Sequence, residues 1–429
     1  MRVLIDFLYL LAGIGFCPKV IYRAVKQKRY RKGWGQRFGN IRRKFPQKQC
    51  IWIHAVSVGE VNATKTLIKA LEQRFIDYEI VISTTTDTGN ARANALYGDR
   101  FYVFYFPLDF SWIMRKAFAR LKPSICLLME LEVWPNLVDI AKKLDIPVVV
   151  VNGRISEKGF GRYKIIRPFV KRTFEKMSLI LSQTQEYARR FRQLGTPPEK
   201  IVVTGTLKYD TAEVTDKVKG AYELAVQLGI DNERLWVAGG TGNDEEQIIL
   251  DVFKQLKEDE TLSDFRLVLV PRKPERFEEV ARLIEQMGLS YVRYSEYKNT
   301  DKRCTDKTAV ILGDTMGDLR KFYSLATLIF VGRSLVPMGG SDMMEAAALG
   351  KCTMFGPHAF NFRQTVEVLL DGKGAFLVQD EDELLEKMRR CLTNSDFAHT
   401  IAENGREVIR RNQGATEKTI NAVADLLNK

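Results

Sequence analysis

The chain has 429 residues, 45 % of them hydrophobic, and its 66 Lys and Arg against 53 Asp and Glu give a net charge of +13. This length predicts two domains rather than one core, and the charge predicts an acidic partner: nucleic acid, anionic lipid or a phosphorylated substrate. With three histidines and six cysteines that form no CxxC pair, the composition argues against a disulfide framework or a zinc site and predicts reduced, mostly buried thiols.

The N-terminal segment, residues 1–32, is apolar and then basic. Its apolar run contains a single acid, Asp6, and is expected to end at Pro18, which is short for a full membrane span of roughly 20 residues. Residues 23–44 hold ten Lys or Arg and no acid. Charge behind the apolar run is the reverse of a cleaved signal peptide and places the remaining chain on the cytoplasmic side. We expect a membrane anchor; the alternative is a buried amphipathic helix.

From residue 50 onward, short apolar stretches alternate with helical patterns. This alternation predicts an α/β fold with a parallel sheet covered on both faces. In the first half the expected strands are 50–56, 78–85, 100–107, 123–130 and 146–154. After a polar junction at 211–231 the pattern restarts, with strands expected at 234–241, 265–272, 289–295, 309–314, 327–334 and 351–357. The chain therefore predicts two doubly wound, Rossmann-like domains, 33–210 and 211–429, with ligands bound beyond the carboxyl ends of the strands.

In the first half, HAVSVGEVNA (54–63) is a strand end followed by a helix start. Ser57 and Gly59 are expected to expose backbone donors toward an acceptor, with His54 beside them and Glu60 in the first helical turn. The alternative is that Glu60 is only a favourable charge at a helix start and that His54 is a satisfied strand-end residue.

A second acidic motif, MELEVWPNL (129–137), follows another strand of the first half. Glu130 and Glu132 are two residues apart and are therefore expected on the same side of the strand. Two acids at a strand end predict a functional role.

In the second half, four glycine-rich or polar loops follow strands: 238–246, 270–277, 312–319 and 336–350. Loops after parallel strands open on one edge of the sheet, so the four should converge. Arg272 has the fork geometry to pair with a phosphate. The Gly339–Gly340 turn would let a helix beginning near Ser341 direct its N–H groups at that phosphate, and Glu345 would accept hydrogen bonds from a ribose. No G-x-G-x-x-G or P-loop is present, which argues against a dinucleotide enzyme or an NTPase.

Several motifs together resemble a known family. HAVSVGEVNA, STTTDTGNAR, MELEVWPNL, VNGRISEKGFGRY, VTGTLKYD, VPRKPERF, LGDTMGDL and FGPHAFNF occur in this order and are similar to those of the Kdo (3-deoxy-D-manno-oct-2-ulosonic acid) transferases of lipopolysaccharide assembly. The resemblance runs from about residue 1 to 420.

The resemblance implies a GT-B fold with two domains facing a cleft. Its N-terminal half would receive a phosphorylated lipid A precursor (lipid IVA), and its C-terminal half would bind the donor CMP-Kdo. It implies inverting transfer without metal or cofactor, on the cytoplasmic face of the inner membrane. The anion near the glycine turn would be the CMP phosphate, with Glu345 on the ribose and Arg272 matching the family's arginine. The nucleotide would be bordered by Gly313, Asp314, Thr315 and Met316.

The chain departs from the family pattern in the motifs that the resemblance assigns to substrate binding and catalysis. An acid, Asp342, replaces the family's Asn, and Gly242 replaces a His. Arg333 replaces the second glycine of a glycine pair and so introduces a cation, and Thr206 replaces an Asn. Gln36 stands where the resemblance places the catalytic base, so the chain would be slow unless another acid takes over. The candidates for that role are Glu60, Glu130 and Glu132.

Other functions remain open from the sequence. A related transferase could move a different sugar or have reduced activity, and a nucleotide-sugar 2-epimerase shares the two-domain architecture but needs neither acceptor nor membrane segment. A nucleic-acid-binding protein would fit the net charge, but the basic residues gather next to the apolar segment, without an RNA- or DNA-binding motif. We therefore expect no nucleic-acid partner.

Overall fold

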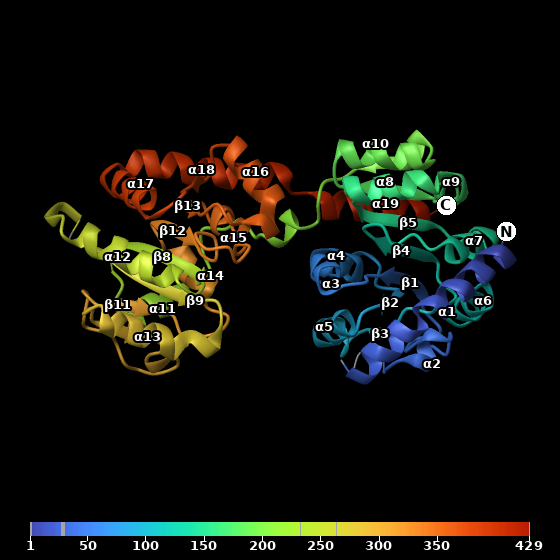
Figure 1. Ribbon diagram of the computed structural model, residues 1–429, viewed down its shortest axis with the longest axis horizontal. Helices are drawn as coiled ribbons and strands as arrows, with labels where there is room; N and C mark the ends of the chain where they lie inside the picture. Colours follow the sequence, from blue (N-terminus) through green and yellow to red (C-terminus); the bar gives the residue numbers. More distant parts are fainter. Residues whose placement is uncertain (1, 27–30, 232, 263, 429) are drawn as a thin grey trace. The chain divides into compact units, whose positions relative to one another are not determined.

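A computed structural model describes residues 2–26, 31–231, 233–262 and 264–428 (Figure 1). The chain divides into two compact units. The first contains Met1–Thr211 and Gln413–Lys429, and the second contains Ala212–Asn412. The two predicted α/β domains are confirmed, but the predicted second domain ends too late. Its last helix, α19 (Ala415–Leu427), packs on the first unit, because Ala415, Ile420 and Val423 belong to that unit's core.

The first unit is built on seven parallel strands in the order β3-β2-β1-β4-β5-β6-β7. Most are fully buried and rich in β-branched residues, as expected for a sheet covered on both faces. The order reverses between β1 and β4, and doubly wound sheets bind ligands at such a switch point, beyond the carboxyl ends of the strands. The strands are β1 (Gln49–His54), β2 (Tyr78–Thr84), β3 (Tyr102–Tyr105), β4 (Ile125–Met129), β5 (Val148–Gly153), β6 (Leu179–Ser182) and β7 (Ile201–Val203).

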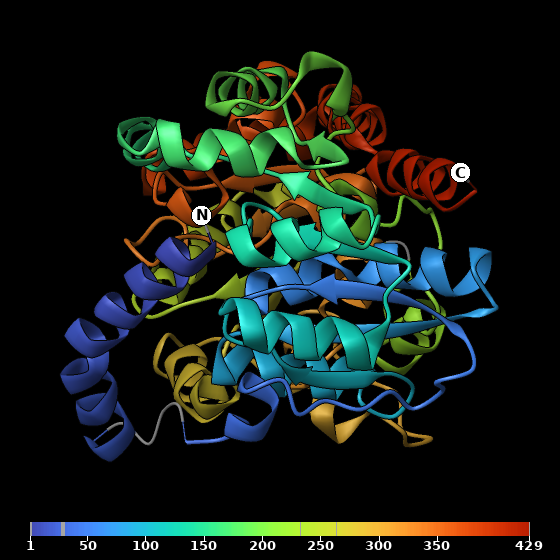
Figure 2. The ribbon, with the colours of Figure 1, turned by 90° about the vertical axis from the view of Figure 1, so that its right-hand side faces the viewer.

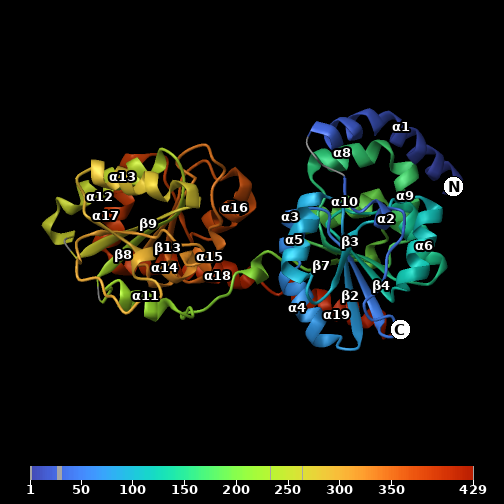
Figure 3. The same cartoon turned by 90° about the horizontal axis from the view of Figure 1, so that it is seen from below.

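Helices cover both faces of this sheet. Alternate residues of β1 point to opposite sides: Trp52 packs with one group of helices, and Ile51 and Ile53 pack with the other. Figure 3 shows α6 on one side of the sheet and α4 and α19 on the other. The Trp52 side holds α6 (Ser111–Leu121), α7 (Pro135–Lys143), α9 (Arg167–Glu175) and α10 (Gln185–Leu194). The Ile51 side holds α3 (Val58–Ala63), α4 (Lys65–Arg74), α5 (Asp87–Tyr97) and α19, while α2 (Trp34–Arg37) and α8 (Glu157–Ile165) are short connecting helices.

Helix α1 (Arg2–Lys26) runs through Pro18, so the helix extends beyond the predicted end of the apolar run. An internal proline removes one hydrogen bond and kinks a helix, but it does not always end it. Phe7, Leu11 and Ile14 are 53 %, 50 % and 64 % exposed. In Figure 2, α1 lies at the margin of the first unit, and its second half extends away from the sheet. Among the described residues, no helix is both long and apolar enough to cross a membrane.

The first half of α1 is attached to the unit by polar contacts. Asp6 accepts hydrogen bonds from the Ser111 backbone N–H (2.9 Å) and from its hydroxyl (2.5 Å), and so acts as a helix cap for α6. Tyr9 donates to Asp109 (3.0 Å), which also accepts the Asn136 N–H at the start of α7 (2.9 Å). Burial raises the pKa of Asp109 to about 7. The acid within the apolar run thus docks the helix rather than interrupting it.

The second unit also has seven parallel strands, in the order β10-β11-β9-β8-β12-β13-β14, which reverses between β8 and β12. The strands are β8 (Arg234–Thr241), β9 (Phe265–Pro271), β10 (Tyr291–Arg293), β11 (Val310–Leu312), β12 (Leu328–Val331), β13 (Cys352–Phe355) and β14 (Phe376–Leu377). The main helices are α11 (Ala221–Gln227), α12 (Glu245–Lys257), α13 (Phe277–Gln286), α14 (Leu319–Leu325), α15 (Met344–Ala348), α16 (Arg363–Asp371), α17 (Glu381–Thr393) and α18 (Ser395–Asn412).

The second unit has a continuous hydrophobic core, and the described cysteines of both units are buried. Trp236 and Ala238 of β8 pack against α12, α13 and α17 in one continuous cluster. Free, buried thiols are found at Cys50, Cys126, Cys304, Cys352 and Cys391, which confirms the prediction of reduced, buried cysteines for the side chains that the structure describes.

Candidate active site

Three carboxylates gather at the switch point of the first sheet. Glu60 lies in α3, after β1, while Glu130 and Glu132 follow β4 directly. Because β1 and β4 are neighbouring parallel strands, their carboxyl ends meet at one edge. They lie close enough for the charge of Glu130 to raise the pKa of Glu60, and for the charges of Glu60 and Glu130 to raise the pKa of Glu132. The structure thus brings together the acids of two motifs that are about 70 residues apart.

Glu60 is held in place by its own helix start. Its two carboxylate oxygens accept hydrogen bonds from the Val56 backbone N–H (2.9 Å) and from the Ser57 hydroxyl (2.9 Å). Ser57 is the N-cap of α3 and accepts the Glu60 N–H in return (3.5 Å). This reciprocal arrangement is a variant of the capping box, in which the glutamate accepts the N–H of the residue before the N-cap. It fixes the carboxylate, which is 8 % exposed, at the edge of the sheet.

Burial and the neighbouring charges raise the pKa of Glu60 and of Glu132. Burial raises the pKa of Glu60, and the charge of Glu130 raises it further. Burial, followed by the charges of Glu60 and Glu130, raises the pKa of Glu132 to about 7. Carboxyl groups with a pKa near neutrality can accept and return a proton at physiological pH. The arrangement is therefore suited to general-base chemistry.

The cluster predicts a pH dependence for any reaction that needs an ionised base here. The acidic limb of the activity should lie above pH 4–5, because burial raises the pKa of Glu60 and raises that of Glu132 to about 7. In Glu130→Gln one repelling charge is gone, so the remaining acids ionise more easily and the limb should move to lower pH. The measurement is the pH profile of kcat/KM. The control Glu199→Gln, an exposed acid before β7, should keep the limb unchanged.

Other predicted residues of the first half are placed differently. His54 is 1 % exposed, stacks on Phe106 with ring centroids 3.9 Å apart, and shares a hydrogen bond with the Ser83 hydroxyl (3.0 Å). Burial lowers its pKa to about 3. The prediction of acceptor contact by His54 was wrong, because a buried, neutral ring has no open face. Gly59 is exposed at the start of α3, as expected.

Gln36 is engaged with strand β3. Its amide oxygen accepts the Tyr105 backbone N–H (2.9 Å), and its amide nitrogen donates to the Tyr102 hydroxyl (3.5 Å). The side chain thus completes the hydrogen bonding of an edge strand. A residue occupied in this way secures α2 to the sheet and is poorly placed to take a proton from a substrate.

In the second unit, the predicted glycine turn packs tightly against the loop around Ala359 and Asn361. Gly339 and Gly340 have φ of 91° and 81°, values that favour glycine. A Cβ at Gly339 would lie 2.1 Å from the Asn361 Nδ2, and one at Gly340 would lie 3.0 Å from the Ala359 Cα. Both glycines are buried against the following loop. They permit a close approach of backbone rather than presenting a row of N–H groups.

The helix expected near Ser341 begins at Met344 instead. The reason is local: Asp342 accepts the Met344 N–H (3.0 Å) and delays the first turn. Ser341 donates to the Gly240 carbonyl (2.9 Å) and joins the loop after β12 to the loop after β8. Glu345 is half-exposed and lies 3.6 Å from the Arg320 Nε.

The loops after β8 and β9 are also joined. The Arg272 backbone N–H donates to the Thr241 carbonyl (3.1 Å), and the Arg272 side chain is exposed at the end of β9. The predicted convergence of the loops after β8, β9 and β12 at one edge is therefore observed. An exposed guanidinium at this edge is suited to hold an anion.

The motif after β11 has a mainly internal role. Asp314 accepts hydrogen bonds from the Arg293 Nε (2.8 Å) and from the backbone and hydroxyl of Ser295 (2.8 and 2.7 Å). Its carboxylate is therefore occupied by contacts within the second unit. Gly313 is buried against Val270, and Thr315 donates to Asp318 (2.6 Å). Met316 is 60 % exposed beside them.

Three of the sequence departures are accommodated by local contacts. A side chain at Gly242 would meet the Met338 sulfur at 2.4 Å, so Met338 occupies the space of the family's His. The Arg333 guanidinium donates to the Met338 carbonyl (2.9 Å) and stays within its own loop. Thr206 is buried in a turn and accepts the Lys208 N–H (3.4 Å).

The sequence does not single out Glu245, which organises the second edge. Its fully buried carboxylate accepts the backbone N–H groups of Ser334 (2.8 Å), Leu335 (3.0 Å) and Gly242 (3.3 Å), as well as that of Arg333. Burial raises the pKa of Glu245, and these N–H groups oppose the rise. One carboxylate thus fixes the loops after β8 and β12. The only sequence signal is an acid in the first turn after a glycine-rich strand end.

In the described residues, no group of three or more His, Cys, Asp or Glu is placed to hold a metal ion.

Comparison with known proteins agrees with these features. The profile of the family described as 3-Deoxy-D-manno-octulosonic-acid transferase (kdotransferase) matches residues 32–211. The 3-deoxy-D-manno-octulosonic acid transferase of Haemophilus influenzae is 33 % identical over 408 residues, which cover 95 % of this chain and 94 % of that protein.

Solved structures show the shared fold. A glycosyltransferase from Rickettsia africae has a TM-score of 0.55 at 15 % identity, covering 89 % of this chain and 99 % of that one. A putative UDP-N-acetylglucosamine 2-epimerase from Listeria monocytogenes has a TM-score of 0.54 at 14 % identity, covering 88 % and 96 %. At such identities the likeness extends to fold alone, whereas the Haemophilus relative matches in sequence along nearly the whole chain. The chain belongs to the 3-deoxy-D-manno-octulosonic acid transferase family of glycosyltransferases.

Proposed function

We propose that this enzyme transfers Kdo from CMP-Kdo to a phosphorylated lipid A precursor, lipid IVA. The observation that carries the proposal is the buried carboxylate group at the switch point of the first sheet, in a chain of this family. Sugar transfer to a hydroxyl needs a base for one proton. We assign this role to Glu60, because hydrogen bonds to both of its carboxylate oxygens fix its side chain.

In the proposed step, a hydroxyl oxygen of the acceptor forms a bond to the anomeric carbon of Kdo. The bond from that carbon to the CMP phosphate breaks, and its electron pair leaves with CMP. The hydroxyl proton passes to Glu60, whose pKa is raised by burial and by Glu130. A single displacement of this kind inverts the anomeric centre. It uses no metal or cofactor, because the proton goes to a carboxylate and the leaving group is already a phosphate.

The donor is expected to bind at the edge of the second unit. The exposed Arg272 at the end of β9 would pair with the CMP phosphate, near the loops that Glu245 and Ser341 fix. In Arg272→Ala the affinity for CMP should fall about 10–150-fold, which corresponds to the 1.5–3 kcal/mol of a charge-assisted contact. Calorimetry with CMP measures this loss. Arg282→Ala, on the exposed side of α13, is the control and should bind CMP normally.

The site of action would be the cytoplasmic face of the inner membrane, with α1 lying in one leaflet. The support is its exposed apolar face, followed by residues 31–44, a stretch that contains several Lys and Arg and no acid. Changing Phe7, Leu11 and Ile14 to Ser keeps the polar attachment through Asp6 and should release the protein into the soluble fraction. Ile76→Ser, which removes an equally exposed residue (74 %) before β2, should leave it on membranes. Sedimentation with anionic vesicles distinguishes the two, and retention of the triple variant would contradict the anchor.

The test of the whole proposal is incubation with CMP-Kdo and lipid IVA, followed by mass spectrometry of the lipid. The expected product carries one or more added Kdo masses and appears together with free CMP. Transfer from another nucleotide sugar but not from CMP-Kdo would overturn the donor assignment, and CMP release without a change in lipid mass would overturn the acceptor assignment.

A further inference from the structure

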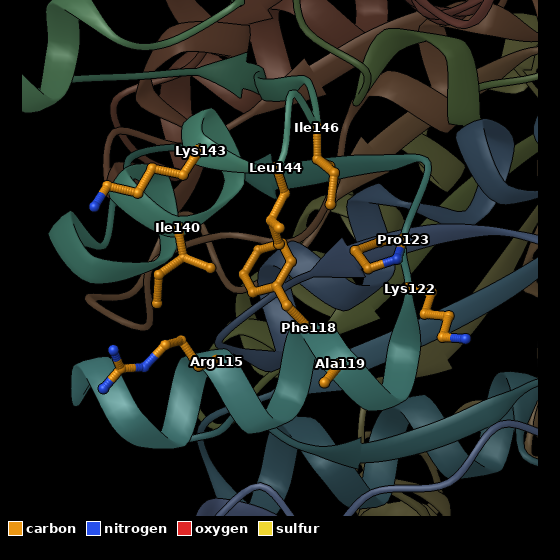
Figure 4. A pocket seen from close by; sticks show the side chains of 9 residues that line it. All are labelled: Arg115, Phe118, Ala119, Lys122, Pro123, Ile140, Lys143, Leu144 and Ile146. Carbon is orange, nitrogen blue, oxygen red and sulfur yellow. The ribbon is translucent and has the colours of Figure 1, made fainter.

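A hollow of about 490 Å³ opens between α6 and α7 in the first unit. Figure 4 shows Phe118, Ile140, Leu144 and Ile146 grouped at its centre. The charged ends of Arg115, Lys122 and Lys143 point outward around this apolar group (Figure 4). Pro123 and Ala119 complete the lining. A volume of this size is typical of pockets that bind small organic molecules.

The charges around the hollow are uncompensated. Within the part of the chain that the structure describes, the side chains of Arg115, Lys122 and Lys143 have no ion pair or hydrogen bond. No carboxylate is among the lining residues, all of which the structure describes. Three unpaired cations around an apolar floor match one ligand chemistry, an apolar chain that ends in an anionic group.

The hollow is separate from the carboxylate group. Pro123 lies just before β4, and Glu130 lies just after it, so the two sites are at opposite edges of the sheet. The five residues of β4 span about 17 Å. A molecule in the hollow is therefore not positioned for the transfer reaction.

Helix α6 runs from Ser111, where α1 is attached, to the hollow near its other end. Trp112, Arg115 and Ala119 are spaced by three or four residues and lie along one stripe of α6, and Lys122 directly follows the helix. Trp112 is 52 % exposed at the first end of the stripe, next to Ser111, which Asp6 of α1 caps. Its ring stacks on Phe38, with ring centroids 6.3 Å apart. Exposed aromatic rings of this kind are typical of the boundary between membrane and water.

We propose that this hollow binds one anionic phospholipid of the membrane on which α1 rests. An acyl chain would lie on Phe118, Ile140 and Leu144, and the phosphate would lie among the three cations. The lipid would be a structural ligand, not a substrate, and would fix the first unit on the membrane at a second point besides α1. This binding needs neither CMP-Kdo nor lipid IVA, so it stands apart from the proposed reaction.

The test uses the full chain on vesicles of phosphatidylcholine that contain phosphatidylglycerol with a photoactivatable acyl chain. Cross-linked peptides are mapped by mass spectrometry. We expect label in residues 115–123 and 140–146. In Lys122→Glu/Lys143→Glu, labelling there should fall by about 30-fold, since two cations are lost. In Ala119→Trp, which fills the hollow and keeps every charge, the label should fall as well.

The matched control is Lys65→Glu/Lys69→Glu, which makes the same charge change on exposed positions of α4, across the sheet. It should keep the label. A phosphatidylcholine probe with the same acyl chain should give little label in the hollow. The proposal is overturned if that neutral probe labels the hollow equally, if the control loses as much as the double variant, or if Ala119→Trp keeps the label. Thermal unfolding of each variant shows that it is folded.

Discussion

Replacing Glu60 by Gln is expected to lower the rate of Kdo transfer by about 10²–10⁴, the usual effect of losing a positioned base. An amide has no useful basicity, so the acceptor hydroxyl would have no group to take its proton. The fold should be unchanged, because Gln can also complete a capping box: its oxygen can accept the Val56 N–H and its NH₂ group can donate to Ser57. Single-turnover kinetics with saturating substrates separate the chemical step from binding.

The matched substitution is Gln36→Glu, which places a carboxylate where the family resemblance expects the base. Gln36 accepts the Tyr105 N–H within the sheet, and a Glu there can do the same. We therefore expect no large change in rate. A large gain from Gln36→Glu, together with full activity of Glu60→Gln, would move the base to position 36 and contradict the assignment to Glu60.

The second large effect is expected from Glu245→Gln in the other unit. The carboxylate of Glu245 accepts several backbone N–H groups, including those of Ser334 and Leu335, whereas an amide offers a single acceptor oxygen. Its NH₂ group would face N–H donors without partners. At about 1–3 kcal/mol for each of two unsatisfied groups, the free energy of unfolding should fall by about 2–6 kcal/mol.

Urea unfolding of this variant measures the loss, and calorimetry with CMP measures its effect on the donor edge. Both stability and CMP affinity should decrease, because Glu245 fixes the loops after β8 and β12. Glu258→Gln, an exposed acid at the end of the same helix, should change neither. Normal stability of Glu245→Gln would show that the buried carboxylate is not needed to hold the loops.

The alternating pattern predicted the sheets well because each strand is buried on both faces. The run VVVVNG of β5 is apolar and β-branched throughout, which leaves few alternatives to a central parallel strand. The same pattern placed Glu60 and Glu130 at strand ends on one edge. Motif positions relative to strands could therefore be predicted from local sequence.

What could not be predicted depends on partners distant in the chain. Asp6 was expected to interrupt an apolar run, but its ligands come from Ser111 and Asn136, more than 100 residues away. His54 looked available at a strand end, but Phe106 covers it. The start of α15 shifted because the side chain of Asp342 captures the Met344 N–H, a choice that depends on one rotamer. Local sequence shows the residue type at each position, whereas these roles are decided by tertiary contacts with residues distant in the chain.

The return of the chain to its first unit has a consequence for biosynthesis. Helix α19 packs on α4 and completes the core cluster on one side of the first sheet, but it follows the whole second unit in the chain. At about 5–20 residues per second, the roughly 200 intervening residues take about 10–40 s to translate. During this interval the apolar residues on which α19 packs remain uncovered in the nascent first unit, because α19 has not yet been synthesised. Ribosome-bound chains that stop before α19 should therefore recruit chaperones, while a chain covering residues 212–412 holds its entire core in one uninterrupted segment.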